Sequence, residues 1–346
     1  MKTLLKELCQ LNGVSGWEDP VRDFIRQQAE DYADSIRTDA LGNLIVFKRG
    51  RKTTGNKLLL AAHMDEVGMI VSQITDEGFL KFQFAGGVDR RVVLGKPVRV
   101  GLSGAAGVIA IKPVHLLTAE ERKKVPKTSE LYLDIGCTSK EAAESQAALG
   151  DPVSFAVEAE EFGTGMLKAK AIDDRAGCAV MLQLLREELP MDVTFAFTVQ
   201  EETGTKGAFG AGFSISPEIA LVLETTTAAD CGGVSEHEQV CWAGKGPVIS
   251  IMDGGTIYDR ALFELLRNQA EQNQIPWQTK HYLSGGNDAR TFQRTRAGVR
   301  TAALSVPVRY LHTPSSVAAL SDIEHTLALA RAFVKAIAEQ EENGIG

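Results

Sequence analysis

Several apolar segments of this 346-residue chain end in side chains that could bind a metal ion. These side chains are His63 with Asp65, Glu201 with Glu202, Glu224, and His312. A further acidic pair, Asp173 and Asp174, stands where a helix is expected to begin. Histidine mixed with carboxylates suits zinc, cobalt or manganese, whereas a set made only of oxygen donors would favour magnesium or calcium. The pattern therefore predicts a transition-metal site.

A site for two metal ions needs one carboxylate that contacts both ions, and an aspartate in a tight turn, here Asp173, is the candidate. His63 and Asp65 are two residues apart, so both side chains leave a strand on the same face. Asp65 could then fix the tautomer of the imidazole. Glu201 and Glu202 are adjacent and point in different directions from an extended chain. One could bind metal while the other holds a proton.

Each of these residues also has a simpler explanation. Asp173 and Asp174 could be the N-cap and a first-turn acid of a helix. Glu201 and Glu202 could be solvated loop charges, and a single histidine at a strand end is more often an ordinary polar residue. What favours a site is their common setting, because ligands of an open α/β sheet bind beyond the carboxyl ends of its strands. The residues are therefore expected to meet at one edge.

The remaining pattern supplies the elements that would position these side chains. Leu4, Leu5, Leu8 and Leu11 predict an amphipathic helix that ends at the Asn12–Gly13 turn, and a second helix is expected from Asp19. Strands are predicted over 44–47, 58–62, 193–199, 219–223 and 301–306, and helices over 173–189 and from 259. The run 58–62 is typical of a strand buried on both faces. Ser321 is the expected N-cap of a long closing helix.

Between residues 69 and 163 the texture changes to short alternating segments such as FLKFQF and KPVRVG, punctuated by Gly and Pro. This is typical of all-β structure. We therefore predict an α/β fold, a mixed sheet flanked by helices, with an inserted small β-barrel-like domain. Residues 1–68 and 164–346 would form the catalytic domain, and residues 69–163 the insert.

The bulk composition excludes some partners. A formal net charge of −8, with no Lys/Arg run longer than residues 122–124, argues against nucleic acid. The five scattered cysteines contain no CxxC pair, which favours reduced thiols. The N-terminal segment lacks the apolar core of a signal peptide, and no apolar stretch reaches the roughly 20 residues of a membrane span. We expect a cytoplasmic protein that does not bind membranes.

A series of motifs resembles one family over nearly the whole chain. They are NGVSGWE, AAHMDEVG, KAIDDRAG, VQEETGTKGA, LETTTAAD, SGGNDA and RYLHTPSS. In this order and spacing the chain resembles the tetrahedral (TET) aminopeptidases, which are glutamyl-aminopeptidase-like metallopeptidases of clan MH, some once labelled cellulase-like. The resemblance implies the fold of that family and the removal of N-terminal residues from short peptides.

The resemblance also implies two divalent ions per subunit, zinc or cobalt, which activate a water between them. One ion would be held by His63, Asp173 and Glu224, and the other by Asp173, Glu202 and His312. Glu201 would be the general base, Asp65 would orient His63, and Asp174 would support Asp173. Short peptides would be the substrates, and dimers formed through the insert would assemble into a tetrahedral dodecamer.

Two positions depart from the family pattern, because Glu224 is commonly an aspartate and Asn287 commonly a threonine. A glutamate reaches about one methylene further, so the preference for a metal could differ. Arg260 and Arg309 are candidates for attracting an acidic substrate side chain, or ordinary structural arginines.

Two other classes of function stay open at this stage. A glycoside hydrolase would use a carboxylate pair without metal, but aromatic residues make up only 6% of the chain and both histidines would lack a task. A non-catalytic metal-binding or assembly protein would have no use for Glu201.

Overall fold

The computed structural model describes residues 1–55, 57–281, 283 and 285–342. Within these residues a ten-stranded sheet and a closed six-stranded barrel account for the strands. The sheet strands follow the order β1-β2-β12-β3-β13-β15-β16-β11-β10, with β14 on β15. Their bounds are β1 (Ser35–Thr38), β2 (Leu44–Lys48), β3 (Leu58–His63), β10 (Glu160–Phe162), β11 (Met166–Ala169), β12 (Val193–Thr198), β13 (Ile219–Thr227), β14 (Val248–Ile249), β15 (Arg300–Arg309) and β16 (Ser316–Ala319).

Helices cover both faces of the sheet. Their bounds are α1 (Lys2–Gln10), α2 (Asp19–Ala29), α3 (Lys140–Glu144), α4 (Ile172–Leu185), α5 (Lys206–Ile215), α6 (Arg260–Gln272), α7 (Ala289–Phe292) and α8 (Leu320–Glu342). Short 3-10 turns are η1 (Glu30–Tyr32), η2 (Arg90–Val92), η3 (Val114–Leu116), η4 (Glu121–Lys123), η5 (Thr128–Glu130) and η6 (Glu236–Glu238). In the described part of the chain, no helix combines the length and apolar character needed to cross a bilayer.

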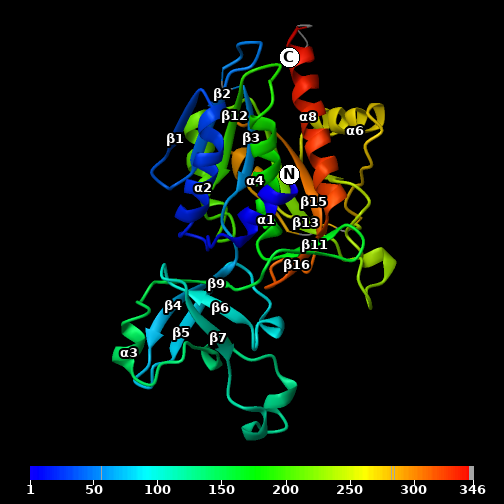
Figure 1. Ribbon diagram of the computed structural model, residues 1–346. Coiled ribbons are helices and arrows are strands. Elements are labelled where there is room, and N and C mark those ends of the chain that lie inside the picture. The colour runs from blue at the N-terminus through cyan, green and yellow to red at the C-terminus, as the bar shows by residue number, and fades with distance from the viewer. Residues whose placement is uncertain (56, 282, 284, 343–346) are drawn as a thin grey trace.

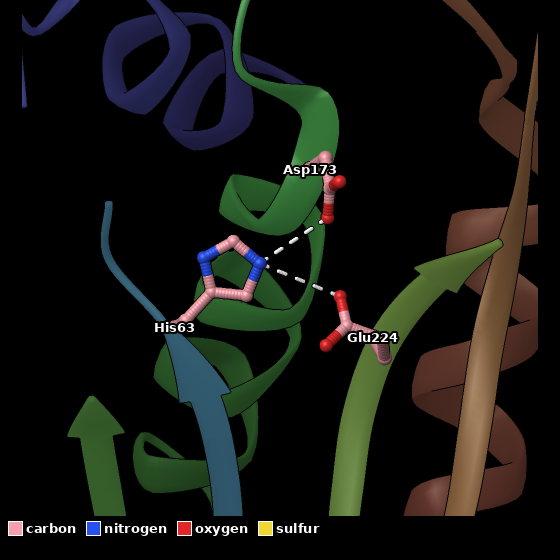
Figure 2. Close-up of side chains that lie close together, drawn as sticks. All are labelled: His63, Asp173 and Glu224. Atoms are coloured by element: carbon pink, nitrogen blue, oxygen red, sulfur yellow. Dashed lines mark hydrogen bonds and ion pairs between the residues drawn. The ribbon is translucent and has the colours of Figure 1, made fainter. Parts of the chain in front are cut away.

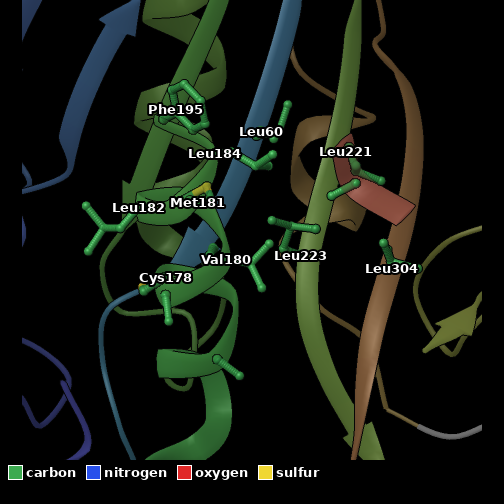
Figure 3. Close-up of a cluster of buried hydrophobic side chains, with 14 of the residues drawn as sticks. Leu60, Cys178, Val180, Met181, Leu182, Leu184, Phe195, Leu221, Leu223 and Leu304 are labelled. Carbon is green, nitrogen blue, oxygen red and sulfur yellow. The ribbon is translucent and has the colours of Figure 1, made fainter. Parts of the chain in front are cut away.

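The central strand β3 shows why its sequence is apolar throughout. Leu58, Leu60 and Ala62 pack into the larger core, which also holds side chains of α1, α2, α4, α6 and α8. Leu59 and Ala61 point the other way, into a second core with α5 and α7. Figure 3 shows α4 running alongside β3 and β13, with their buried side chains together in the larger core. The predicted burial on both faces is confirmed, since all six residues of β3 are buried.

The barrel is a separate body beyond the end of β3 (Figure 1). Its strands are β4 (Gly68–Ile74), β5 (Leu80–Ala85), β6 (Pro97–Val100), β7 (Ala105–Ala110), β8 (Tyr132–Asp134) and β9 (Pro152–Phe155), closed in the order β4-β5-β8-β7-β6-β9. It has a hydrophobic core of its own, which includes Met69, Leu80 and Phe155. The mixed sheet flanked by helices and the barrel-like insert confirm the predicted fold class. The domain boundaries at 69 and 163 stay a prediction, and β10 within that range pairs in the large sheet.

Several predicted elements differ in their ends. The closing helix α8 begins at Leu320, directly after β16, so the prediction of Ser321 as its N-cap is wrong. The chain passes there from strand into helix without a capping turn. The Leu320 amide instead donates to the Gly165 carbonyl (2.9 Å). Helix α4 stops at Leu185, and β13 continues to Thr227.

Candidate functional site

Four neighbouring parallel strands bring the candidate ligands to one edge of the sheet. β12, β3, β13 and β15 run parallel in that order. His63 is the last residue of β3, Glu224 lies in the C-terminal half of β13, and Glu201 and Glu202 follow β12 after two residues. His312 follows β15 after two residues. Because the barrel starts five residues after His63, this edge faces the barrel (Figure 1).

Two groups of possible ligand atoms lie at this edge and share Asp173. One group is His63, Asp173 and Glu224, and the other is Asp173, Glu202 and His312, with the ligand atoms of each group within 4.8 Å of one another. Figure 2 shows the first group, in which the imidazole of His63 points at both carboxylates. Its Nε2 atom is 3.3 Å from Asp173 Oδ1 and 3.5 Å from Glu224 Oε1.

The second group mirrors the first across Asp173. His312 Nε2 is 3.2 Å from Asp173 Oδ2 and 3.2 Å from Glu202 Oε2. The two oxygens of Asp173 therefore face two different histidines. One carboxylate placed between two sets of donors has the arrangement that a bridging ligand requires.

Asp65 contacts both His63 and the turn that carries Glu201 and Glu202. His63 Nδ1 lies 3.1 Å from the Asp65 carbonyl and 3.4 Å from Asp65 Oδ1, which leaves Nε2 facing the other ligands. The carboxylate of Asp65 accepts the amides of Glu201 (2.9 Å) and Glu202 (3.1 Å) and the hydroxyl of Ser15 (2.5 Å). One buried aspartate thus fixes an imidazole and the turn that carries two glutamates.

The charges of the site are crowded. Burial, followed by repulsion from Asp173, raises the pKa of Glu202 to about 8. Burial also raises the pKa of Glu224. Burial alone would lower the pKa of His312, but hydrogen bonding to Asp173 and the charge of Glu202 raise it to about 9. Buried carboxylates that repel one another beside imidazoles are what a cation would stabilise, so these donors fit divalent metal ions.

The Glu201 side chain lies at the cavity and belongs to neither group of possible metal ligands. It lines a cavity of about 310 Å³ together with His63, Asp173, Glu224 and His312. Within the described residues its carboxylate has no hydrogen-bond partner, although its amide is held by Asp65. Burial raises its pKa well above the usual range, and the charges of Asp288 and Glu224 add to the effect. This is the setting of a group that can take up and release a proton.

Asp174, which we expect to support Asp173, contacts the backbone of the helix that carries both residues. Its Oδ1 accepts the amide of Gly177 (2.9 Å) inside α4, and its Oδ2 has no partner among the described residues. Burial and the charge of Glu224 raise its pKa well above the usual range. Through this hydrogen bond, Asp174 stabilises the first turn of α4 next to Asp173.

Some polar residues around the site had no predicted role. Ser15 and Glu18 belong to the NGVSGWE motif, and Glu18 accepts the amide of Gln200 (3.0 Å) just before the two glutamates. Burial and Asp65 raise the pKa of Glu18 to about 7. Asp288 accepts the Thr198 hydroxyl (2.6 Å) at the end of β12. Only the fold shows these contacts, because they join distant segments. Ser284, which opens the SGGNDA motif, lies outside the described residues.

Comparison with known proteins identifies the family. Residues 42–329 match the M42 glutamyl aminopeptidase family. The lysyl aminopeptidase of Pyrococcus furiosus is 31% identical over 340 residues, which cover 96% of each chain. An aminopeptidase structure from Desulfurococcus kamchatkensis has a TM-score of 0.91 at 38% identity and covers 96% of this chain and 93% of that chain.

A third relative is known as an assembly. The TET1 peptidase of Pyrococcus horikoshii, which can assemble into a tetrahedron or a large octahedral shell, is 35% identical with a TM-score of 0.85. The match covers 96% of this chain and 98% of that chain. With the family match over most of its length and this agreement in fold, the chain belongs to the M42 glutamyl aminopeptidase family.

Proposed function

We propose that this aminopeptidase removes N-terminal residues from short peptides with a water activated between two divalent metal ions. The observation that carries the proposal is the shared carboxylate of Asp173, whose two oxygens face His63 and His312 at the floor of one cavity. A single-ion site would not need two donor sets that meet at one residue.

The ligand assignment follows from the two groups. His63, Asp173 and Glu224 would hold one ion, and Asp173, Glu202 and His312 the other. When bound, a pair of such ions would lower the pKa of a water and polarise the scissile carbonyl. Nitrogen and carboxylate donors together favour zinc or cobalt over magnesium or calcium. The 3.5 Å distance between Glu224 Oε1 and His63 Nε2 supports Glu224, with its longer side chain, as a ligand of the first ion.

Glu201 would manage the proton of the reaction. Its raised pKa suits a base that takes a proton from the attacking water and later donates it to the leaving amine. Asp65 would act through others, because it holds the Glu201 amide and the His63 ring rather than facing the cavity. Proton transfer would therefore depend on a turn that Asp65 fixes and on the Glu201 carboxylate that this turn directs into the cavity.

The assay that tests this function compares aminoacyl p-nitroanilides before and after metal removal. We expect hydrolysis to stop on full chelation and to return with zinc or cobalt. Loss of the N-terminal residue alone, seen by mass spectrometry of a short peptide, would show exopeptidase action. A β-glucanase activity that survives chelation, with no peptide cleavage, would contradict the proposal.

We further propose that the chain assembles as a homo-oligomer, from dimers formed through the barrel to a tetrahedral dodecamer. Support comes from the TET1 relative and from apolar side chains that the barrel exposes, among them Leu102 at 75% and Val114 at 66%. Light scattering is expected to give a particle about twelve times the 37.3 kDa chain mass. A monomer at all concentrations would contradict it.

A further inference from the structure

A lysine lines the same cavity as Glu201 and the proposed metal ligands. Among the described residues that line the cavity, Lys280 is the only lysine or arginine, and it stands with Thr226, Gly286 and Asn287. It lies in the connection between α6 and α7, far in sequence from the proposed metal ligands. The described lining also includes three carboxylates, those of Asp173, Glu201 and Glu224, so this lysine is the lining side chain best suited to bind a substrate anion away from the proposed metal ions.

The backbone around Lys280 is held on both sides. The Gln278 amide donates to the Pro247 carbonyl (3.0 Å), and the Gln278 side chain donates to the Trp242 and Gly246 carbonyls (both 2.8 Å). After Lys280, the His281 amide donates to the Val240 carbonyl (2.9 Å). The lysine is therefore placed by the fold and does not hang from a free loop.

The ammonium group has no counter-charge in hydrogen-bond contact among the described residues. Asp253 and Glu224 act on it only through longer-range electrostatics. Asp253 is already engaged by the Thr256 amide (2.8 Å) and the Tyr258 hydroxyl (2.5 Å). Glu224 faces His63. Burial lowers the pKa of Lys280, and the nearby acids oppose that effect. An incoming anion would stabilise this half-buried ammonium group by forming a charged hydrogen bond with it.

The two arginines considered from the sequence do not reach this space. Arg309 forms a paired interaction with Asp230, at 2.8 Å and 2.6 Å. Arg260 is exposed at the first turn of α6. Neither lines the cavity. An anionic substrate group that enters the cavity would meet Lys280 instead.

We propose, building on the aminopeptidase function above, that Lys280 binds a carboxylate of the peptide substrate. Substrates that carry this carboxylate would then be preferred over neutral analogues. Two carboxylates of a short peptide can supply this chemistry. One is the side chain of an acidic N-terminal residue, and the other is the C-terminal carboxylate of a peptide short enough to span the cavity. Both place an anion opposite the metal ligands.

The test uses Lys280→Met, Lys280→Arg and, as a control, Lys245→Met. Lys245 is exposed, does not line the cavity, and precedes the Gly246 carbonyl that anchors the same connection. For each protein, kcat/KM is measured on the p-nitroanilides of glutamate and glutamine, which lack a C-terminal carboxylate. It is also measured on the dipeptide Ala-Leu and its amide, which lack an acidic side chain.

Loss of one charged hydrogen bond should reduce the matching ratio, acid over neutral analogue, by roughly 10- to 100-fold in Lys280→Met. A fall in the glutamate to glutamine ratio assigns the side chain, and a fall in the ratio of dipeptide to amide assigns the C-terminus. Lys280→Arg should keep part of the ratio, and Lys245→Met should keep all of it. If both ratios are the same in Lys280→Met and the wild type, the proposal is overturned.

Failure of the proposed function would look different. If the zinc- or cobalt-loaded wild type hydrolyses none of these compounds, the peptidase proposal falls on its own. Binding then tests Lys280 directly, with L-glutamate against L-glutamine and Ala-Leu against its amide, measured by calorimetry. A preference for the anionic compound that disappears in Lys280→Met supports the role, and equal binding of each pair by the wild type contradicts it.

Discussion

At the scale of single residues, the division of labour between Glu201 and Glu202 depends on the direction of their side chains. Both amides bind the same carboxylate of Asp65. From that shared anchor, Glu202 turns toward His312 while Glu201 turns into the cavity. Adjacent residues of the same type can therefore hold a metal and a proton separately.

Replacing Glu201 by Gln tests that division. The amide cannot accept the proton, so kcat should fall by roughly 10²- to 10⁴-fold. Metal content, measured by mass spectrometry of the protein solution, should not change because Glu201 belongs to neither ligand group. Glu236→Gln, at an exposed position in η6 outside the cavity, is the matched control. Full turnover by Glu201→Gln would remove Glu201 from its role.

Metal binding should release protons. Without an ion, the pKa values of about 8 for Glu202 and about 9 for His312 keep both ligands largely protonated at pH 7. A cation must displace those protons, so apparent affinity should rise as pH increases toward about 9. Calorimetric titration with cobalt at pH 7, in buffers of different ionisation enthalpy, gives the number of protons. Binding without proton release and with equal affinity at pH 6 and pH 8 would contradict this.

At the scale of elements, the sequence predicts the candidate metal ligands better than it predicts the helices and side chains that hold those ligands in place. His63 and Glu224 could be found because each ends or interrupts a long apolar strand, and parallel strands bring such residues together. Helix α5 was not predicted, because its Gly- and Phe-rich sequence has little helical periodicity and is stabilised by packing in the second core. Contacts such as Ser15 with Asp65 depend on tertiary structure and leave no local pattern.

The close approach of α5 to β12 gives a prediction for the element that carries the glutamates. A Cβ at Gly207 would lie 2.4 Å from the Val199 carbonyl oxygen and 2.6 Å from the Val199 amide, which cannot move aside cheaply. Gly207→Ala should therefore lower the free energy of unfolding by about 1–3 kcal/mol. Gly232→Ala, where a Cβ would meet nothing within 4 Å, is the control. Thermal or urea unfolding that does not separate the two variants would contradict this.

At the scale of the whole molecule, the barrel closes one side of the site. The chain enters it directly after β3, and its segments return to the metal ligands. A Cβ at Gly86 would lie 3.3 Å from Glu202 Cβ, and Phe155 lines a second small pocket with Glu202 and His312. The insert could be recognised in the sequence by its change of texture, but its contact with the site could not, because that depends on how the two bodies meet.

The most direct measurement is an anomalous difference map from zinc-loaded crystals, collected at the zinc absorption edge. Two peaks are predicted in each subunit, one among His63, Asp173 and Glu224 and one among Asp173, Glu202 and His312. Asp173 should touch both. A map with no peak in either group, or with metal bound only elsewhere on the chain, would contradict the proposed dinuclear site.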